Sequence, residues 1–213
     1  MPSPTTADAR TCYELFETSA AVSMQSKPRI TPAEYLALER AAETKSEYFN
    51  GEMFAMAGAS YAHNLITGNV ITALHAQLRG RDCTVSASDL RVKVPATGLY
   101  TYPDVVVVCD TPRLEDEHMD TLLNPKVIIE VLSESTADYD RGRKFEHYRT
   151  IDSFVEYVLI AQDKAHVEHF LRQSPTQWLF SETNRIEDTI ALTSIDCQLS
   201  LADVYAKVDL HSA

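Results

Sequence analysis

The sequence lacks any apolar run that approaches the 18 or so residues of a membrane span. Residues 1–27 of the 213-residue chain also lack the charged start and apolar centre of a secretory signal. A cytoplasmic location is therefore expected. The same residues, rich in Ser, Thr and Ala, show no strong periodicity and are expected to form a flexible N-terminal arm, whereas residues 28–210 are expected to form one domain.

Paired cysteines are also missing from the sequence. The four cysteines lie far apart: Cys12, Cys83, Cys109 and Cys197. This pattern indicates neither a zinc site nor a disulfide framework. We expect free thiols in a reducing compartment.

Basic residues are too few to balance the acidic ones. The chain has 19 Lys and Arg against 31 Asp and Glu, a formal net charge of -12. This balance opposes binding to a polyanion, because Lys and Arg contacts to phosphates normally supply the affinity. Three local groups of basic residues soften the objection: Arg79 with Arg81, Arg91 with Lys93, and Arg141 and Arg143 with Lys144. Binding to nucleic acid should be weak and salt dependent, and specific targeting could need a partner protein.

Turn and capping signals divide the chain into elements. Thr31, Pro32 and Glu34 have the pattern of a capping box that begins a short helix. Asn50-Gly51, between two half-apolar runs, predicts a hairpin. A helix over about 60–79 follows, with apolar residues largely on one face, and then three strands near 83–94, 101–109 and 126–132.

A second helix, capped by Ser135 or Thr136, is expected to run to about residue 149. Strands near 154–161 and 165–172 come next, followed by outer strands in "TQWLFSE" and "TIALTS" and a terminal helix in "SLADVYAKV". The order of helix, three strands, helix and strand predicts an α/β fold with a mixed sheet flanked by helices.

Two of the predicted strands carry an acid where burial is expected. Asp104 comes directly before four valines, and Glu130 lies inside "VIIEVL". Unbroken Val and Ile runs are typical of strands buried on both faces. Asp104 alone is most simply a turn residue, since Pro-Asp is a common turn pair. Glu130 has apolar neighbours on both sides and is harder to explain as solvated surface, so the two acids suggest a shared site.

The segments "SEYFNGE", "AHNLITGNV", "YPDVVVV", "IIEVLSEST" and "DYDRGRKFEHY" occur in that order. Together they resemble the Uma-type family of restriction endonuclease-like proteins, within the PD-(D/E)XK nuclease superfamily. The resemblance covers about residues 30–210. It implies the restriction-endonuclease-like core and a metal-dependent endonuclease that hydrolyses phosphodiester bonds, with DNA as the expected nucleic acid.

One position departs from the superfamily pattern. A lysine is expected two residues after the strand acid, where this sequence has Leu132. The resemblance implies that Lys144, on the following helix, takes this role. Asp140, Lys144 and Tyr148 are spaced i, i+4 and i+8 and can share one helix face. Without the family, a solvated face with an Asp-Lys ion pair would be the simpler interpretation.

The resemblance also implies the chemistry of the site. Asp104 and Glu130 would offer hard oxygen ligands to Mg²⁺ or Mn²⁺, and Lys144 would orient or activate water. His63 could act beside the metal or could be an ordinary helix-face histidine. Glu47 could complete the metal shell or could be an exposed hairpin residue, and Asp89 is a weaker candidate.

Other features leave alternatives open. His166 and His169 lack the spacing of a helical zinc motif and are expected at the surface. The outer strands leave sheet edges that a second copy of the chain could cover, so we expect a homodimer.

Leu132 and the acidic charge favour a rival interpretation, a non-catalytic binding or assembly module with the nuclease fold. A hydrolase of small phosphate esters is a third hypothesis.

Overall fold

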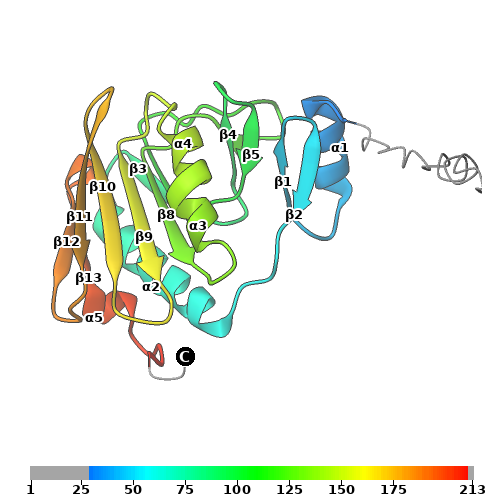
Figure 1. Cartoon of the computed structure of the whole chain (residues 1–213). Helices are drawn as coiled ribbons and strands as arrows, with labels where there is room; N and C mark the ends of the chain where they lie inside the picture. Colours follow the sequence, from blue (N-terminus) through cyan, green and yellow to red (C-terminus); the bar gives the residue numbers. More distant parts are fainter. Residues whose placement is uncertain (1–28, 211–213) are drawn as a thin grey trace, which may run out of the picture.

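The computed structural model describes residues 29–210, so the expected N-terminal arm, residues 1–27, lies outside the described residues. A six-stranded sheet organises the fold, in the order β11-β10-β9-β8-β6-β3 (Figure 1). Its strands are β3 (Cys83–Ala87), β6 (Val105–Cys109), β8 (Val127–Leu132), β9 (Glu156–Ala161), β10 (Val167–Ser174) and β11 (Gln177–Thr183). Neighbouring strands are antiparallel except β8 and β9, which are parallel.

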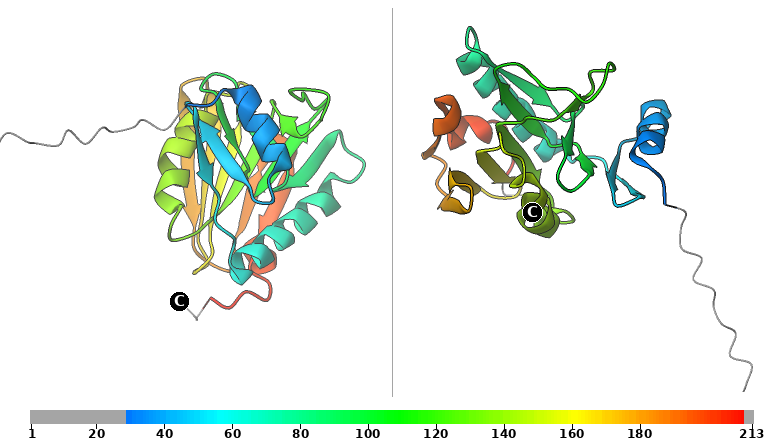
Figure 2. Two further views of the ribbon diagram at one scale, coloured as in Figure 1. Left: turned by 90° about the vertical axis from the view of Figure 1, so that its right-hand side faces the viewer. Right: turned by 90° about the horizontal axis from the view of Figure 1, so that it is seen from above.

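The long helix α2 (Tyr61–Leu78) covers one face of this sheet. The segment from α3 (Ala137–Tyr139) to α4 (Phe145–Tyr148) covers the other, as Figure 2 shows. Alternate residues of β6 point to opposite faces of the sheet. Val105 and Val107 pack with α2, whereas Val106 and Val108 pack with Tyr148 of α4. This explains the unbroken valine run, because a strand covered on both sides has no polar face. The predicted order of helix, three strands, helix and strand is confirmed.

A second sheet joins the expected N-terminal hairpin to three strands that were not expected to pair with it. It has the order β2-β1-β5-β4-β7 and lies beside α1 (Pro32–Ala41). Its strands are β1 (Ser46–Phe49), β2 (Glu52–Ala55), β4 (Arg91–Val94), β5 (Leu99–Thr101) and β7 (Thr121–Leu122). The expected single strands near 83–94 and 101–109 are therefore wrong. A turn closed by the Leu90 amide and the Ala87 carbonyl separates β3 from β4, and Pro103 lies between β5 and β6, so each run divides between two sheets.

Local signals at the N-terminal end of the domain are confirmed. Thr31 and Glu34 form the capping box of α1. Asn50 and Gly51 have φ angles of 50° and 86°, as a two-residue hairpin turn with both central residues at positive φ requires. The turn pairs β1 with β2 and places Glu47 in β1 opposite Phe54.

The second helix is less regular than expected. It consists of α3, a π-helical turn η1 (Asp140–Lys144) and α4. Thr136 occupies the N-cap position, but its side chain makes no capping hydrogen bond. A π turn is rare and occurs frequently at functional sites, and this one carries both Asp140 and Lys144.

The chain ends in a two-stranded ribbon and short helices. β12 (Thr189–Leu192) pairs with β13 (Cys197–Ser200) around the 3₁₀ turn η2 (Thr193–Ile195). The terminal helix α5 spans only Leu201–Val204, shorter than expected. In the part of the chain that the structure describes, no helix is both long and apolar enough to cross a membrane.

The expectation of free thiols is wrong for two cysteines. Cys83 in β3 and Cys109 in β6 face each other in register and form a disulfide. They are 26 residues apart in sequence, and only the pairing of the two strands brings them together. Cys197 is a buried free thiol, and Cys12 lies outside the described residues.

Candidate active site

The two strand acids lie side by side. Val105 pairs with Ile129 in the antiparallel β6-β8 ladder, which places Asp104 opposite Glu130. The Asp104 amide donates to Glu130 Oε2 at 3.3 Å, and the Val131 amide donates to Asp104 Oδ2 at 2.7 Å. The structure therefore brings Asp104 and Glu130 together, as the sequence predicted.

Lys144 reaches the same acids from the π turn. Its ammonium lies 3.0 Å from Glu130 Oε1, 3.3 Å from Asp140 Oδ1 and 3.6 Å from Glu47 Oε1. The Lys144 side chain is only 6% exposed. The interpretation of this helix face as a solvated surface is wrong, because it packs onto the sheet.

Hydroxyl groups complete the cluster. Tyr148 donates to Glu130 Oε1 at 3.0 Å. Tyr139 donates to Glu47 Oε2 at 2.9 Å, and Thr101 donates to Glu47 Oε1. Sequence reasoning missed Thr101 and Tyr139 as site residues. Thr101 could have been found from its position three residues before Asp104. Nothing in the sequence pattern indicates Tyr139.

The cluster contains more acids than bases. Among residues 29–210, the ammonium of Lys144 pairs with Glu47, Glu130 and Asp140, and Asp104 adds a fourth carboxylate beside Glu130. Four carboxylates around one ammonium leave an excess of negative charge, and the usual remedies for buried negative charge are protons or cations. This surplus is an electrostatic basis for cation binding.

The pKa values reflect this crowding. Burial, with the nearby carboxylates of Asp140 and Asp104, raises the pKa of Glu130 to about 8 although Lys144 opposes the change. Burial lowers the pKa of Lys144, but the attraction of Glu130, Asp140 and Glu47 outweighs it and holds that pKa well above its ordinary value. The lysine therefore carries its positive charge at neutral pH.

His63 contacts the other side of the acid pair. It lies in the first turn of α2, where the Ser60 hydroxyl caps the helix by accepting from the His63 amide at 3.0 Å. Its Nε2 is 3.0 Å from Asp104 Oδ2. Its Nδ1 is buried without a hydrogen-bond partner among residues 29–210. His63 thus belongs to the cluster and is not an ordinary helix-face residue.

The acid pair suits a hard divalent cation. Among residues 29–210, no donor contacts Asp104 Oδ1, and Glu130 Oε2 accepts only from the Asp104 amide. No group of three His, Cys, Asp or Glu side chains in this part of the chain is placed to hold a metal ion. Two carboxylates nevertheless fit Mg²⁺, which usually keeps several waters and binds through one or two protein carboxylates plus substrate phosphate.

Several sequence candidates lie elsewhere. The Asp89 side chain is 91% exposed and pairs with Lys45 at 2.5 Å. Most members of the basic groups pair with acids: Arg81 with Asp196, Arg91 with Asp120, Lys93 with Glu115, Arg141 with Glu168, and Lys144 within the cluster. Arg79 and Arg143 are exposed.

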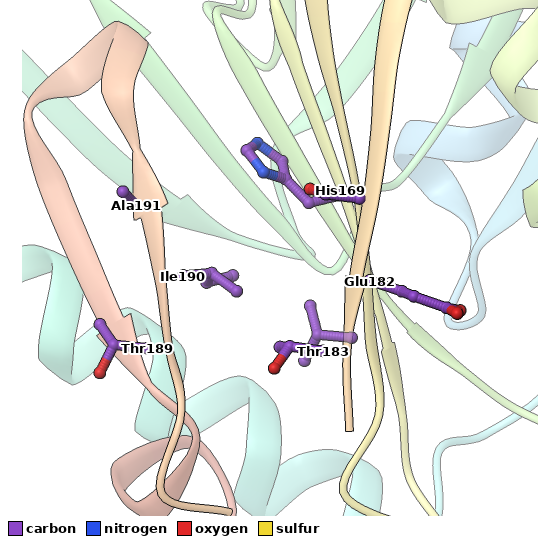
Figure 3. Close-up of a pocket in the computed structure, with 8 residues that line it drawn as sticks. His169, Glu182, Thr183, Thr189, Ile190 and Ala191 are labelled. Atoms are coloured by element: carbon purple, nitrogen blue, oxygen red, sulfur yellow. The ribbon is translucent and has the colours of Figure 1, made fainter. Parts of the chain in front are cut away.

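The outer histidines differ from expectation. His169 is buried, its Nε2 lies 3.5 Å from Glu156 Oε1, and His166 is half-buried beside Glu182. Figure 3 shows His169 pointing into a pocket of about 310 Å³ between the β10-β11 hairpin and β12. The expected surface position is therefore wrong for His169, because β12 covers this face of the sheet.

Comparisons with known proteins agree with the fold. The family model Uma2, described as "Putative restriction endonuclease", matches residues 32–203. The uncharacterized protein sll1609 of Synechocystis sp. is 40% identical over 153 residues, which cover 72% of this chain and 86% of that protein. A second Synechocystis protein, slr1290, is 33% identical over 178 residues, covering 84% and 92%.

A solved structure has the same architecture. The crystal structure of "a putative nuclease belonging to DUF820" from Anabaena variabilis superposes with a TM-score of 0.67. The identity is 20%, and the match covers 83% of this chain and 97% of that one. This likeness confirms the nuclease-like α/β fold. On the family match and the two relatives, the chain belongs to the Uma2 family of restriction endonuclease-like proteins.

Proposed function

We propose that this protein is a metal-dependent phosphodiester hydrolase that acts as a DNA endonuclease. The observation that carries the proposal is the buried cluster of Asp104, Glu130 and Lys144, with Lys144 Nζ 3.0 Å from Glu130 Oε1. The family membership of residues 32–203 supports the same class of activity.

Asp104 and Glu130 would hold Mg²⁺ or Mn²⁺ through the two oxygens that have few or no donors. A divalent cation in such a place lowers the pKa of water and neutralises a scissile phosphate. Residues around the pair keep its geometry: the Val131 amide fixes Asp104 and the Tyr148 hydroxyl fixes Glu130.

Lys144 would supply a fixed positive charge beside the phosphate. Hydrolysis of a phosphodiester develops negative charge in the transition state, and a cation already in position stabilises that charge without reorganisation. Because its acidic neighbours keep it protonated, Lys144 would orient water and stabilise the phosphate and would not accept a proton. His63 would orient Asp104 through the contact at 3.0 Å.

A second function is favoured by one observation. Most of the basic side chains expected to contact DNA are paired with acids within the chain, which suits a non-catalytic binding or assembly module. A cleavage assay separates the two. Supercoiled plasmid should be nicked in the presence of Mn²⁺ by the wild-type protein and not by Glu130→Gln.

The matched control is Glu156→Gln, which changes a buried strand carboxylate outside the cluster. This variant should keep nicking activity if the loss in Glu130→Gln is specific to the site. A wild-type protein that neither binds Mn²⁺ in calorimetry nor nicks plasmid would overturn the hydrolase and favour the module.

A further inference from the structure

Glu47 enters the cluster from a different sheet. It lies on β1, in the second sheet, and its side chain is 12% exposed. Hydroxyl groups occupy both of its oxygens: Thr101 donates to Oε1 and Tyr139 to Oε2. A carboxylate fixed from both sides in this way holds a defined position beside Lys144.

The acids around Lys144 divide into two pairs. Asp104 and Glu130 contact each other through the Asp104 amide, and Asp104 makes no ion pair with Lys144 among the described residues. Glu47 and Asp140 both contact the ammonium, at 3.6 Å and 3.3 Å. A cation held by Glu130 would compete with Lys144 for that carboxylate, so the ammonium would then depend on Glu47 and Asp140.

The contacts of Glu47 also differ from those of the acid pair. Both Glu47 oxygens already accept from hydroxyl groups, whereas Asp104 Oδ1 has no donor among residues 29–210, so the acid pair offers the more open oxygen to a metal ion. The nearest charged group to Glu47 in the cluster is the Lys144 ammonium.

We propose that Glu47 is a positioning residue that holds Lys144 in the site, together with Asp140, and is not a ligand of the metal. The inference rests on the function proposed above. It makes the hairpin β1-β2 part of the catalytic machinery, because the lysine on the π turn is held by a carboxylate from the second sheet.

Two measurements test this role without DNA cleavage. The first is Mn²⁺ affinity by calorimetry for Glu47→Gln, Asp140→Asn and Asp104→Asn. Asp104→Asn loses a direct ligand, so its Mn²⁺ affinity should fall by more than about tenfold. The Mn²⁺ affinities of Glu47→Gln and Asp140→Asn should lie within about threefold of each other, and each variant should lose much less affinity than Asp104→Asn.

The second is the rate of reductive methylation of Lys144, followed by peptide mass, with exposed Lys164 as the internal reference. Glu47→Gln removes the ion pair that holds the ammonium at 3.6 Å, so Lys144 should be less restrained and react at least about threefold faster in this variant. Tyr139→Phe, which frees Glu47 Oε2, should give a change in the same direction with unchanged Mn²⁺ affinity.

The outcomes distinguish this inference from the proposed function. If Glu47→Gln loses Mn²⁺ affinity as Asp104→Asn does, or if Lys144 reacts at the wild-type rate in both Glu47→Gln and Tyr139→Phe, the positioning role is wrong even when the protein nicks plasmid. If the labelling pattern holds but the wild type does not nick plasmid, the positioning role stands and the hydrolase falls.

Discussion

Replacing Glu130 by Gln should stabilise the metal-free protein at pH 8 and remove much of the pH dependence of its stability. The Glu130 carboxyl is buried beside Asp104 and Asp140, and its pKa is raised from 4.5 to about 8. An acid with a raised pKa binds more protons in the folded than in the unfolded chain. Folding stability from this group is therefore greatest below about pH 4.5 and falls as the pH rises toward 8.

The magnitude follows from the two pKa values. A change from 4.5 to about 8, at ~1.4 kcal/mol for each pKa unit, gives an upper limit of about 5 kcal/mol for the loss between pH 4 and pH 9. Lys144 does not change the pH dependence of stability in this range. Because its pKa is raised, its contribution to the free energy of unfolding is complete below about pH 10 and is lost only above it.

Urea unfolding in EDTA at several pH values from 5 to 8 measures the effect, with wild type and Glu130→Gln compared at each pH. The difference between the two proteins isolates Glu130 from the histidines, which titrate in the same range. The free energy of unfolding of the variant should exceed that of the wild type increasingly as the pH rises. A wild-type stability that is flat or rises from pH 5 to 8 relative to the variant would refute the reasoning.

Three further predictions concern other parts of the structure. Lys144→Met should lower the free energy of unfolding of the metal-free protein by about 3–5 kcal/mol at pH 7, because it leaves buried carboxylates without their cation; a loss below 1 kcal/mol in urea unfolding would contradict this. Reduction of the Cys83–Cys109 disulfide should cost about 3 kcal/mol by loop entropy, and equal unfolding midpoints with and without reductant would argue against it. The free edge of β11, where Leu179 and Phe180 are 55% and 50% exposed, should support a homodimer, and light scattering that gives the mass of one chain, 23.8 kDa, would exclude it.

The sequence alone could predict the centre of the site, because acidic residues occur there in segments that are otherwise apolar and expected to be buried. Glu130 stands among apolar residues and Asp104 adjoins a valine run, so both were visible as acids in need of partners. Lys144 came from the family resemblance, because an Asp-Lys pair at i and i+4 is equally typical of an exposed helix. The packing of Tyr148 on Val106 and Val108 distinguishes the two cases.

The remaining features depend on contacts between distant segments. The turn at Leu90 transfers the chain from one sheet to the other, and a continuous apolar pattern does not mark that change. The Cys83–Cys109 pair and the burial of His169 both depend on which strands become neighbours. The basic groups looked available because sequence proximity shows the charge of Arg141 or Lys93, but not the acids that neutralise them.

The π turn constrains how this helix can vary in length. A π turn contains one residue more than a regular α-helical turn, so removing one residue from η1 would convert it into a regular turn without rotating the flanking segments by a full residue step. A relative that is one residue shorter here could therefore keep Tyr139 and Tyr148 on the same side of the helix. It would lose the wide turn that carries Asp140 and Lys144 into the cluster.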